Sequence, residues 1–395
     1  MSDQVIKSDD NSSGLFVGLM SGTSLDGVDA VLMEIEGQNP ASIRWRVLGF
    51  VSEPYSADER SRIRAAIASG SAEELALIHA ELGRCFVRST RSLLRDTGTA
   101  PESLIAIGSH GQTVWHEPPT DRERGVTLQL GDAATLAEEI GCPVVADFRS
   151  RDMAAWGHGA PLVPWSDWVL LRRHGVGRAL QNLGGMGNVT FLPADGGFER
   201  VLGFDTGPGL ALLDRVTQLA TNGDQPWDRD GARAAKGSVI PGLLAGLLDD
   251  EFFATQPPRS TGRERFGDRR VDEIVRELRP KHESEWNDLL ATLVQLTAQS
   301  IASSYERFLP VGAVDEVVLA GGGARNPTLV AAIRDAVSPL SVETGATALG
   351  IDPDAREAAA FAVLAWAHVR GVPGNAPTAT GASGTRVLGA LYPGR

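Results

Sequence analysis

Short apolar runs that enter glycine-rich turns recur along the chain. The first run, Leu15–Met20, is followed by a Ser-Gly-Thr-Ser turn at residues 21–24 and then by a second apolar run, Val28–Leu32. Asp26 and Gly27 directly precede the second run, and this dipeptide is common in tight turns between strands. We therefore predict a β-hairpin in this part of the chain.

Two later apolar runs enter helices, so each is a predicted strand–turn–helix unit. The parts of the first are strand 200–204, turn 205–209 and helix 211–219, and the parts of the second are strand 316–320, turn 321–324 and helix 326–333. Pro327 suits the first turn of its helix, because the N–H that proline lacks would have no helical partner there.

Long helices are predicted where apolar residues recur at three- and four-residue spacing. They cover Ala72–Leu94, Leu289–Leu309 and Arg356–Val369. Ser71 and Glu74 have the types and spacing of a capping box at the start of the first helix. Strands that alternate with helices predict an α/β fold.

The length of the chain predicts two lobes, since 395 residues exceed what one ordinary hydrophobic core supports. We place the boundary near residues 151–161, a stretch with glycine and proline that follows a predicted strand, Pro143–Phe148. A last predicted strand, Thr385–Leu391, could return to the first lobe. The first lobe would then comprise residues 1–155 plus 375–395, with the first phosphate loop and part of the sugar site, and the second lobe residues 156–374.

Charge narrows the classes of partner. The chain has 37 Lys+Arg against 50 Asp+Glu, a net charge of −13, which repels nucleic acid and anionic membranes alike. No apolar run approaches the roughly 18 residues of a membrane span. We therefore expect neither nucleic acid nor a membrane as partner. ATP stays compatible with this charge, because backbone N–H groups and a divalent cation can reverse the potential locally.

The location is predicted from two further features. Residues 1–14 are polar and lack the apolar segment of a signal peptide. Cys85 and Cys142 are the only cysteines and lie far apart, without the spacing of a disulfide scaffold or a metal site. A reducing, cytoplasmic location is therefore expected.

The first glycine-rich turn has groups that could bind phosphate. Gly22 would let a phosphate approach the backbone, while Thr23 and Ser24 add hydroxyl donors. Asp26 and Asp29 could hold Mg²⁺ directly or through water. The same residue types are ordinary turn formers, so a plain hairpin turn explains this segment equally well when it is taken alone.

The turn at residues 205–209 strengthens the case for a nucleotide. Asp205 lies at the end of a predicted strand beside Thr206, Gly207 and Gly209, just before a helix N-terminus that favours anions. A helix cap is the simpler explanation of this carboxylate. With a third turn at Gly321–Gly323, however, the chain has what a split nucleotide cleft needs, namely two turns for phosphates and one to lie against adenosine.

A segment at residues 109–116, next to the predicted strand Leu104–Gly108, suits a sugar. Trp115 could cover apolar C–H groups, while His110 and Gln112 could exchange hydrogen bonds with hydroxyls. A metal site from His110 and His116 is not expected, because their spacing is wrong and no carboxylate lies between them. A buried strand-end histidine with a structural tryptophan remains the alternative.

Two further stretches are weaker candidates. Arg149 and Asp152, with the loop at residues 157–162, are consistent with a substrate-facing loop or with a simple linker between lobes. Glu357 is an acidic residue in the first turn of a predicted helix, where a negative charge is favourable without any further role.

With these residues in place, the chain from Gly14 to Pro393 resembles the anhydro-N-acetylmuramic acid kinase family. The matching stretches are short but numerous and in order: 20–30, 110–116, 128–132, 147–149, 159–167, 182–190, 203–214, 228–231, 261–266, 321–326 and 357–365. The resemblance implies the two-lobed, actin-like ATPase fold that is shared with sugar kinases and heat-shock chaperone ATPases, with ATP bound between the lobes. That wider fold often has Asp where this chain has Met20.

The resemblance also implies roles for individual residues. The implied ATP-binding residues are Gly22, Thr23, Ser24, Leu25, Asp26, Gly27, Val28, Asp29, Gly207, Gly209, Gly321, Gly322, Gly323 and Asn326. The implied substrate-binding residues are Ser21, His110, Gln112, Trp115, Asp205 and Glu357, and Asp26 is the implied Mg²⁺ ligand. Since proteins similar to this family often form dimers, a homodimer is expected.

The implied reaction couples hydrolysis to phosphoryl transfer. Asp205 would be the general base for a water that attacks the anomeric carbon of the anhydro bridge, and the freed 6-oxygen would attack the γ-phosphoryl group of ATP. A free Asp has a pKa of about 3.9 and is a poor base at neutral pH, so desolvation would have to raise it. Trp156, His158 and Leu210 depart from the family pattern, which puts fine substrate contacts in doubt.

Two other functions remain open at this point. One is a kinase of the same fold that acts on an ordinary hexose or a carboxylate, against which Met20 and the 110–116 segment argue. The other is a nucleotide-dependent regulator or chaperone-like switch, which has no need of a carboxylate such as Asp205.

Overall fold

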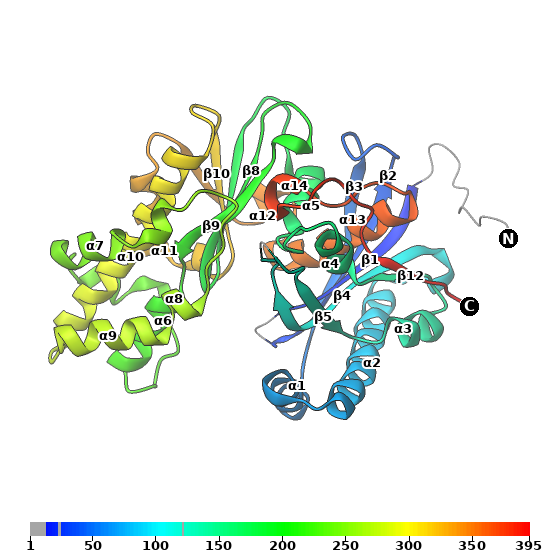
Figure 1. The fold of residues 1–395 in the computed structure, drawn as a ribbon, viewed down its shortest axis with the longest axis horizontal. Helices are drawn as coiled ribbons and strands as arrows, with labels where there is room; N and C mark the ends of the chain where they lie inside the picture. The colour runs from blue at the N-terminus through cyan, green and yellow to red at the C-terminus, as the bar shows by residue number, and fades with distance from the viewer. Residues whose placement is uncertain (1–12, 23–24, 121) are drawn as a thin grey trace. The chain divides into compact units, whose positions relative to one another are not determined.

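The computed structural model describes residues 13–22, 25–120 and 122–395, and the chain divides into two compact units. The first comprises Met1–Leu170 and Asp354–Arg395, and the second comprises Leu171–Pro353 (Figure 1). Each unit has its own sheet and its own helices, so the prediction of a mixed α/β fold is confirmed.

The described part of the first unit contains a seven-stranded sheet in the order β12-β6-β4-β1-β2-β3, with β5 paired to β4. The strands are β1 Ser13–Ser21, β2 Gly27–Glu36, β3 Arg44–Pro54, β4 Leu104–Glu117, β5 Val126–Leu130, β6 Val144–Ala146 and β12 Ala390–Tyr392. The predicted hairpin is present, since β1 and β2 are antiparallel and Met20 lies opposite Asp29. The last strand does return to this unit, antiparallel to β6, but it covers only Ala390–Tyr392.

Helices cover both faces of this sheet. They are α1 Ala57–Ser69, α2 Ala72–Thr97, α3 Ala133–Ile140, α4 Phe148–Ala154, α5 Val163–Leu171, α13 Arg356–Val369 and α14 Pro377–Thr380. The predicted capping box opens α2, because Ser71 Oγ accepts from the Glu74 N–H and the Glu74 carboxylate accepts from the Ser71 N–H. Val17 and Leu19 of β1 point into the core that includes α2, and Gly18 between them faces the other side of the sheet.

Helix α13 lies against that other face at very short range. A Cβ atom on Gly18 would lie 1.9 Å from the carbonyl oxygen of Ala358, and one on Gly108 would lie 2.1 Å from that of Phe361. Gly18 and Gly108 are neighbours in the register of β1 and β4. Only a residue without a side chain lets the helix backbone approach this closely.

This packing explains why the division of the chain differs from the predicted one. Residues 156–170 and 354–374, which the sequence analysis placed in the second lobe, belong to the first unit. Helix α13 accounts for most of the second stretch and is fixed on β1 and β4, while Arg356 at its start forms a buried ion pair with Asp167 of α5.

The second unit, residues 171–353, is built on a five-stranded sheet in the order β11-β10-β7-β8-β9. The strands are β7 Arg178–Leu183, β8 Met186–Leu192, β9 Leu202–Pro208, β10 Glu316–Ala320 and β11 Ser341–Thr344. The helices are α6 Ala211–Ala220, α7 Pro241–Leu248, α8 Arg263–Phe266, α9 Asp268–Leu278, α10 Glu283–Phe308, α11 Pro327–Ala336 and α12 Ala346–Leu349. Apolar residues of α6, α10 and α11 pack with those of the sheet in one core.

None of the helices in the part of the chain described by the structure combines the length and the apolar character that crossing a membrane requires.

Candidate functional site

The turn of the first hairpin is held by its buried and backbone groups. Leu25 is 4% exposed, has a φ of 58°, and donates its N–H to the carbonyl oxygen of Gly22 at 3.2 Å. The Tyr55 N–H donates to the Asp26 carbonyl oxygen at 3.0 Å, while the Asp26 side chain is exposed. Leu25 is therefore an anchor of the turn, and Asp26 is open to a ligand. Thr23 and Ser24, two of the predicted phosphate-binding residues, lie outside the described residues.

A buried hydrogen-bond network joins the two ends of this turn, Ser21 and Gly27, to each other and to β4. Ser21 Oγ lies 2.7 Å from Gln112 Oε1, 2.8 Å from Tyr55 Oη and 3.1 Å from the carbonyl oxygen of Gly27. Ser21 and Gln112 are 1% and 0% exposed. The structure thus brings together two predicted sugar-binding residues, and their observed contacts are with the protein itself.

The other members of the predicted phosphate segment begin strand β2. Val28 is buried. The Asp29 carboxyl is half-buried and hydrogen-bonded to Ser52, and desolvation, followed by repulsion from Asp354 and Asp26, raises its pKa above the usual range. Asp29 is thus a carboxylate that a cation would stabilise.

His110 accepts hydrogen bonds from Arg149. Its Nδ1 lies 2.8 Å from the carbonyl oxygen of Gly111, to which it donates, so the neutral ring presents Nε2 as an acceptor. Arg149 donates to Nε2 through Nε at 3.1 Å and through its second terminal nitrogen at 2.8 Å, and it also donates to Gly159. Desolvation and the Arg149 charge hold the pKa of His110 well below its usual range. His110 is therefore a buried, uncharged residue that orients Arg149.

The segment at residues 109–116 lies within a strand. The predicted strand ended at Gly108, whereas β4 continues to Glu117, because its second half pairs with β5. Trp115 lies on this extension and is 58% exposed, so its ring is available to a ligand.

Asp152 has a structural role in the first unit. It is fully buried, and its carboxylate accepts hydrogen bonds from the Gly159 N–H at 2.9 Å, Asn375 Nδ2 at 2.7 Å and Thr380 Oγ1 at 2.9 Å. These bonds attach the loop around Gly159 to the C-terminal segment. Arg149, which contacts the same loop, is half-buried, and burial lowers its pKa to about 10.

Glu357 lies in the first turn of α13, as predicted, with an exposed side chain. The neighbouring Arg356 is buried and bidentate to Asp167, with an Nε–Oδ1 distance of 2.8 Å. Protein atoms around the Glu357 carboxyl still desolvate it and raise its pKa, although Arg356 and Arg149 act in the opposite direction. Arg149 and Glu357 are thus electrostatically coupled in the first unit.

In the second unit, three glycine turns meet at one edge of the sheet. Strands β7 and β10 are parallel and β8 is antiparallel to both β7 and β9, so the ends at residues 183–186, 208–211 and 320–323 lie on the same side. Direct contacts agree: the Leu210 N–H donates to the Gly184 carbonyl oxygen at 2.8 Å, and Gly321 approaches Asn182 and Leu183 with a φ of 80°. The edge also receives the N-termini of α6 and α11.

Several predicted nucleotide groups at this edge are engaged within the protein. The N–H groups of Gly209 and Ala211 both donate to the carbonyl oxygen of Gly185. Asn326 is the N-cap of α11, where Oδ1 accepts from the Leu329 N–H at 3.0 Å. Gly207 lies within β9, and Gly322 and Gly323 open the short turn before α11. The predicted residues are therefore gathered in one place, with their role towards ATP still a prediction.

Asp205 lies inside β9, and a bulge follows it. Asn188 of β8 is opposite Asp205 while Gly187 is opposite Gly207, so Thr206 is the extra residue. The prediction that Asp205 lies at a strand end is therefore wrong, since β9 continues to Pro208. Asp205 is not a helix cap either, because the N-cap residue of α6 is Leu210, which makes no side-chain capping bond. The bulge re-aims residue 205 within the strand.

The surroundings of Asp205 suit a general base. The Thr261 N–H donates to Oδ2 at 2.8 Å, and among the described residues no protein hydrogen bond involves Oδ1. Desolvation raises the pKa of Asp205 to about 6, against the hydrogen bond from Thr261 and the charge of Arg259, while Glu264 adds to the rise. A carboxylate with this pKa is ionised at neutral pH yet accepts a proton more readily than a free Asp.

Two residues that contact Asp205 were missed by sequence reasoning. Arg259 donates through Nε to the Asp205 carbonyl oxygen at 2.8 Å, and Thr261 donates to its carboxylate. The one sequence signal that points to Thr261 is that residues 261–266 belong to the matching family stretches. Arg259 lies outside those stretches.

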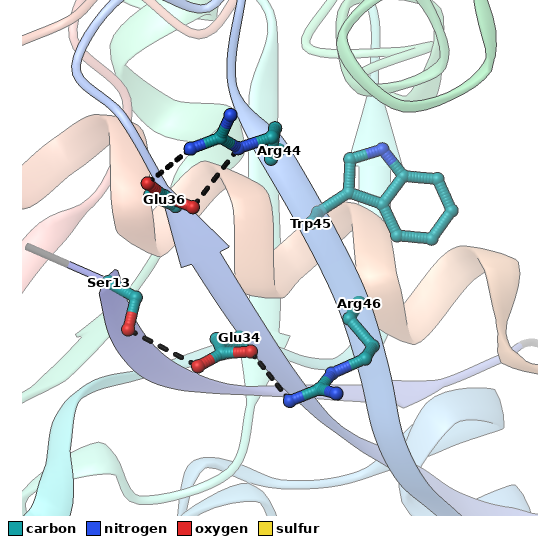
Figure 2. Close-up of a pocket in the computed structure, with 6 residues that line it drawn as sticks. All are labelled: Ser13, Glu34, Glu36, Arg44, Trp45 and Arg46. Carbon is teal, nitrogen blue, oxygen red and sulfur yellow. Dashed lines mark hydrogen bonds and ion pairs between the residues drawn. The ribbon is translucent and has the colours of Figure 1, made fainter.

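Two surface pockets, both lined by described residues, lie apart from all these residues. Figure 2 shows one of about 370 Å³ on the outer strands β2 and β3, where Arg44 pairs with Glu36 and Arg46 pairs with Glu34 at 2.9 Å. The charged side chains that line this pocket are thus paired with one another. A second pocket, of about 610 Å³, lies along the arginine-rich face of α2 and contains none of the predicted site residues.

Comparisons with known proteins give the relationship directly. The sequence model of the anhydro-N-acetylmuramic acid kinase family matches residues 14–394. An anhydro-N-acetylmuramic acid kinase of Caldanaerobacter subterraneus subsp. tengcongensis is 41% identical over 396 residues, which cover 98% of this chain and 99% of the relative. One from Gloeobacter violaceus is 44% identical over 384 residues, with 96% and 98% covered.

Among solved structures, a ROK hexokinase from Thermus thermophilus matches 89% of this chain and 99% of its own, with 16% identity and a TM-score of 0.37, which is too low to carry an argument. The sequence matches define the chain as a kinase by class. More specifically, it belongs to the anhydro-N-acetylmuramic acid kinase family.

Proposed function

We propose that this kinase uses ATP to phosphorylate 1,6-anhydro-N-acetylmuramic acid while water opens the anhydro bridge, with Asp205 as the general base. The observation that carries the proposal is the state of Asp205. One carboxylate oxygen is fixed by the Thr261 N–H, no protein hydrogen bond among the described residues uses the other, and the pKa is raised to about 6.

The reaction balances with one water and one ATP. Asp205 takes a proton from water as the water oxygen bonds to the anomeric carbon, and the bond from that carbon to the 6-oxygen breaks. The freed 6-oxygen takes the γ-phosphoryl group, and ADP leaves. The products are N-acetylmuramic acid 6-phosphate, ADP and the proton that Asp205 returns to solvent. This is the reaction expected of a kinase in the recycling of cell-wall sugars.

Each unit contributes its own groups to this scheme. In the second unit, the glycine turns at Gly207–Gly209 and Gly321–Gly323 bring backbone close to a bound nucleotide, and the N-terminus of α11 favours its phosphates. In the first unit, the turn that contains Gly22 and Asp26 is the phosphate-binding candidate. Trp115 and Glu357 are exposed and are the groups we assign to sugar binding, with Arg149 oriented by His110.

The first unit has two carboxylates, Asp26 and Asp29, that we propose as ligands for Mg²⁺. Of the residues described, no group of three or more His, Cys, Asp or Glu side chains could enclose a metal ion. Mg²⁺ in kinases typically needs only one or two carboxylates together with substrate phosphates and water. Asp26, which is exposed, and Asp29, whose ionised carboxyl is disfavoured by burial and then by neighbouring acids, would supply them. When bound there, Mg²⁺ would neutralise charge on the transferring phosphoryl group.

We also propose that the protein is a homodimer in the cytoplasm.

The test is the Asp205→Asn variant, which keeps an acceptor oxygen for the Thr261 N–H but cannot take a proton. We expect loss of sugar phosphorylation by at least a hundredfold, which is within the range of about 10²–10⁴ for a general base, with ATP binding retained. The readout is product formation from the anhydrosugar, with ATP affinity from calorimetry.

The matched control is Asp272→Asn, which removes a carboxylate of the same unit that pairs with Arg215 on the surface. It should leave turnover within twofold of wild type. Near-normal turnover in Asp205→Asn, or preference of the wild-type enzyme for an ordinary hexose over the anhydrosugar, would contradict the proposed function.

A further inference from the structure

Arg259 is the residue that joins Asp205 to the rest of the second unit. It is 7% exposed, and its guanidinium donates to five protein oxygens. The acceptors are the carbonyl oxygens of Asp205 at 2.8 Å, Phe252 at 3.2 Å, Phe253 at 3.4 Å and Thr255 at 3.1 Å, and Ser304 Oγ at 2.8 Å. One side chain thus connects β9, the turn at residues 252–255 and helix α10.

The charge of this guanidinium is unusual for its depth. Within the described chain it has no carboxylate oxygen at ion-pair distance, and it is surrounded by the rings of Phe204, Phe252 and Phe308 at 5.4, 4.6 and 4.6 Å. Burial lowers the pKa of Arg259 to about 10. Carbonyl dipoles and aromatic faces therefore stabilise the charge in place of an ion pair. Only the planar fork of an arginine can serve acceptors in so many directions.

The chain around Arg259 is attached to Asp205 in both directions. The Asp205 N–H donates to the Arg259 carbonyl oxygen at 3.2 Å, and the Arg259 Nε donates back to the Asp205 carbonyl oxygen. Two residues further on, the Thr261 N–H donates to Oδ2 of the Asp205 carboxylate. The orientation of the carboxylate therefore depends on where residues 259–261 are held.

We propose that Arg259 is a positioning residue for the general base: its guanidinium fixes residues 259–261 against β9, so that Thr261 occupies Oδ2 and leaves Oδ1 to take the proton from water. This inference rests on the proposed function of Asp205. Arg259 does not touch substrate in this scheme and acts through residue 205.

The electrostatic effect gives a second signature. The Arg259 charge lowers the pKa of Asp205 against the larger effect of desolvation. Removing the charge should move the pKa of Asp205 upwards, so that activity is lost at a higher pH on the acid side. Keeping the charge but losing the fork should impair turnover with a smaller shift, which comes from a weakened Thr261 hydrogen bond alone.

The experiment compares Arg259→Lys, Arg259→Met and a control, Arg307→Met, by kcat, KM and pH profile on the anhydrosugar. Arg307 also donates to the Phe253 carbonyl oxygen, at 3.1 Å, but its side chain is exposed and makes no bond to Asp205. We expect Arg259→Lys to lower kcat about tenfold, in line with the cost of a small misplacement of a reacting group, with KM unchanged and the acid limb moved less than in Arg259→Met. Arg259→Met should move the acid limb up by about one pH unit, and Arg307→Met should match wild type.

A readout that is independent of turnover separates this inference from the proposed function. The pKa of Asp205 can be followed by NMR of enzyme with ¹³C-labelled Asp carboxyls, with Asp205→Asn for assignment. The pKa of Asp205 should rise more in Arg259→Met than in Arg259→Lys. A wild-type enzyme that makes no product would overturn the function while the NMR titration still tests the positioning.

The inference fails if Arg259→Lys folds, by circular dichroism and ATP binding, with kcat within twofold of wild type. It also fails if Arg259→Met folds and leaves the pKa of Asp205 unchanged. If Arg259→Met does not fold, the result of Arg259→Lys decides.

Discussion

Replacing Asp205 by Asn should make the protein inactive and, at the same time, more stable. Desolvation raises the pKa of Asp205 from its ordinary 3.8 to about 6, so the ionised carboxylate is disfavoured in the folded state relative to the unfolded chain. This penalty is complete above about pH 6, decreases as the pH falls, and disappears below the unfolded pKa. Asn is neutral at every pH and does not carry it.

The magnitude follows from the pKa difference. A rise from 3.8 to about 6 corresponds to about 3 kcal/mol at pH 8. The side chain is only partly buried, so solvent screening reduces the effect, and we expect about 1.5 kcal/mol. The second unit spans residues 171–353, a size at which about 1 kcal/mol changes the melting temperature by about 2–4 °C. The variant should therefore melt about 3–6 °C higher than wild type.

The assay is calorimetry of both proteins without ligands at pH 8 and pH 5. At pH 5 the linkage relation leaves only about half of the difference, because part of the folded carboxyl is then already protonated. A variant that melts at or below the wild-type temperature at pH 8, or a difference that does not shrink at pH 5, would refute the claim that Asp205 is held as a desolvated carboxylate.

Three other outcomes are expected. Turnover (kcat/KM) should fall about tenfold per pH unit as the pH drops below about 6, since the base must be ionised, and a rate that stays flat down to pH 5 would speak against Asp205. Gly18→Ala places a Cβ 1.9 Å from the Ala358 carbonyl oxygen and should cost at least about 3 kcal/mol in urea unfolding, whereas a neutral result would show that α13 is not packed on β1 as described. Arg356→Ala leaves the buried Asp167 without its partner and should cost about 3–5 kcal/mol, most of it recovered when Asp167→Ala is added; additive costs in the double variant would exclude the coupling.

The elements that the sequence predicts well are those fixed by neighbouring residues. The hairpin of β1 and β2 follows from two apolar runs and a polar turn, and α2 begins at its capping box because Ser71 and Glu74 are three residues apart. Helix α13 has the predicted bounds, Arg356–Val369, because its alanine-rich apolar run is itself continuous in the sequence. In each case the pattern that predicts the element lies within one short stretch of the sequence.

The features that could not be predicted depend on contacts between distant segments. Strand β4 extends to Glu117 only because β5 pairs with it, and α13 belongs to the first unit because Gly18 and Gly108 let it approach two strands. The sequence shows Asp205 as a carboxylate beside glycines, but its place in a bulged strand depends on the register with β8. The hydrogen bonds from Arg259 and Thr261 span 54 and 56 residues, so no local pattern indicates them.

The central claim is that water opens the anhydro bridge while the 6-oxygen of the sugar receives the phosphoryl group. Mass spectrometry of the product formed in water enriched with heavy oxygen tests it most directly. The account predicts one labelled oxygen, on the anomeric carbon, and none in the transferred phosphate. Label in the phosphate, or a product without label, would contradict it.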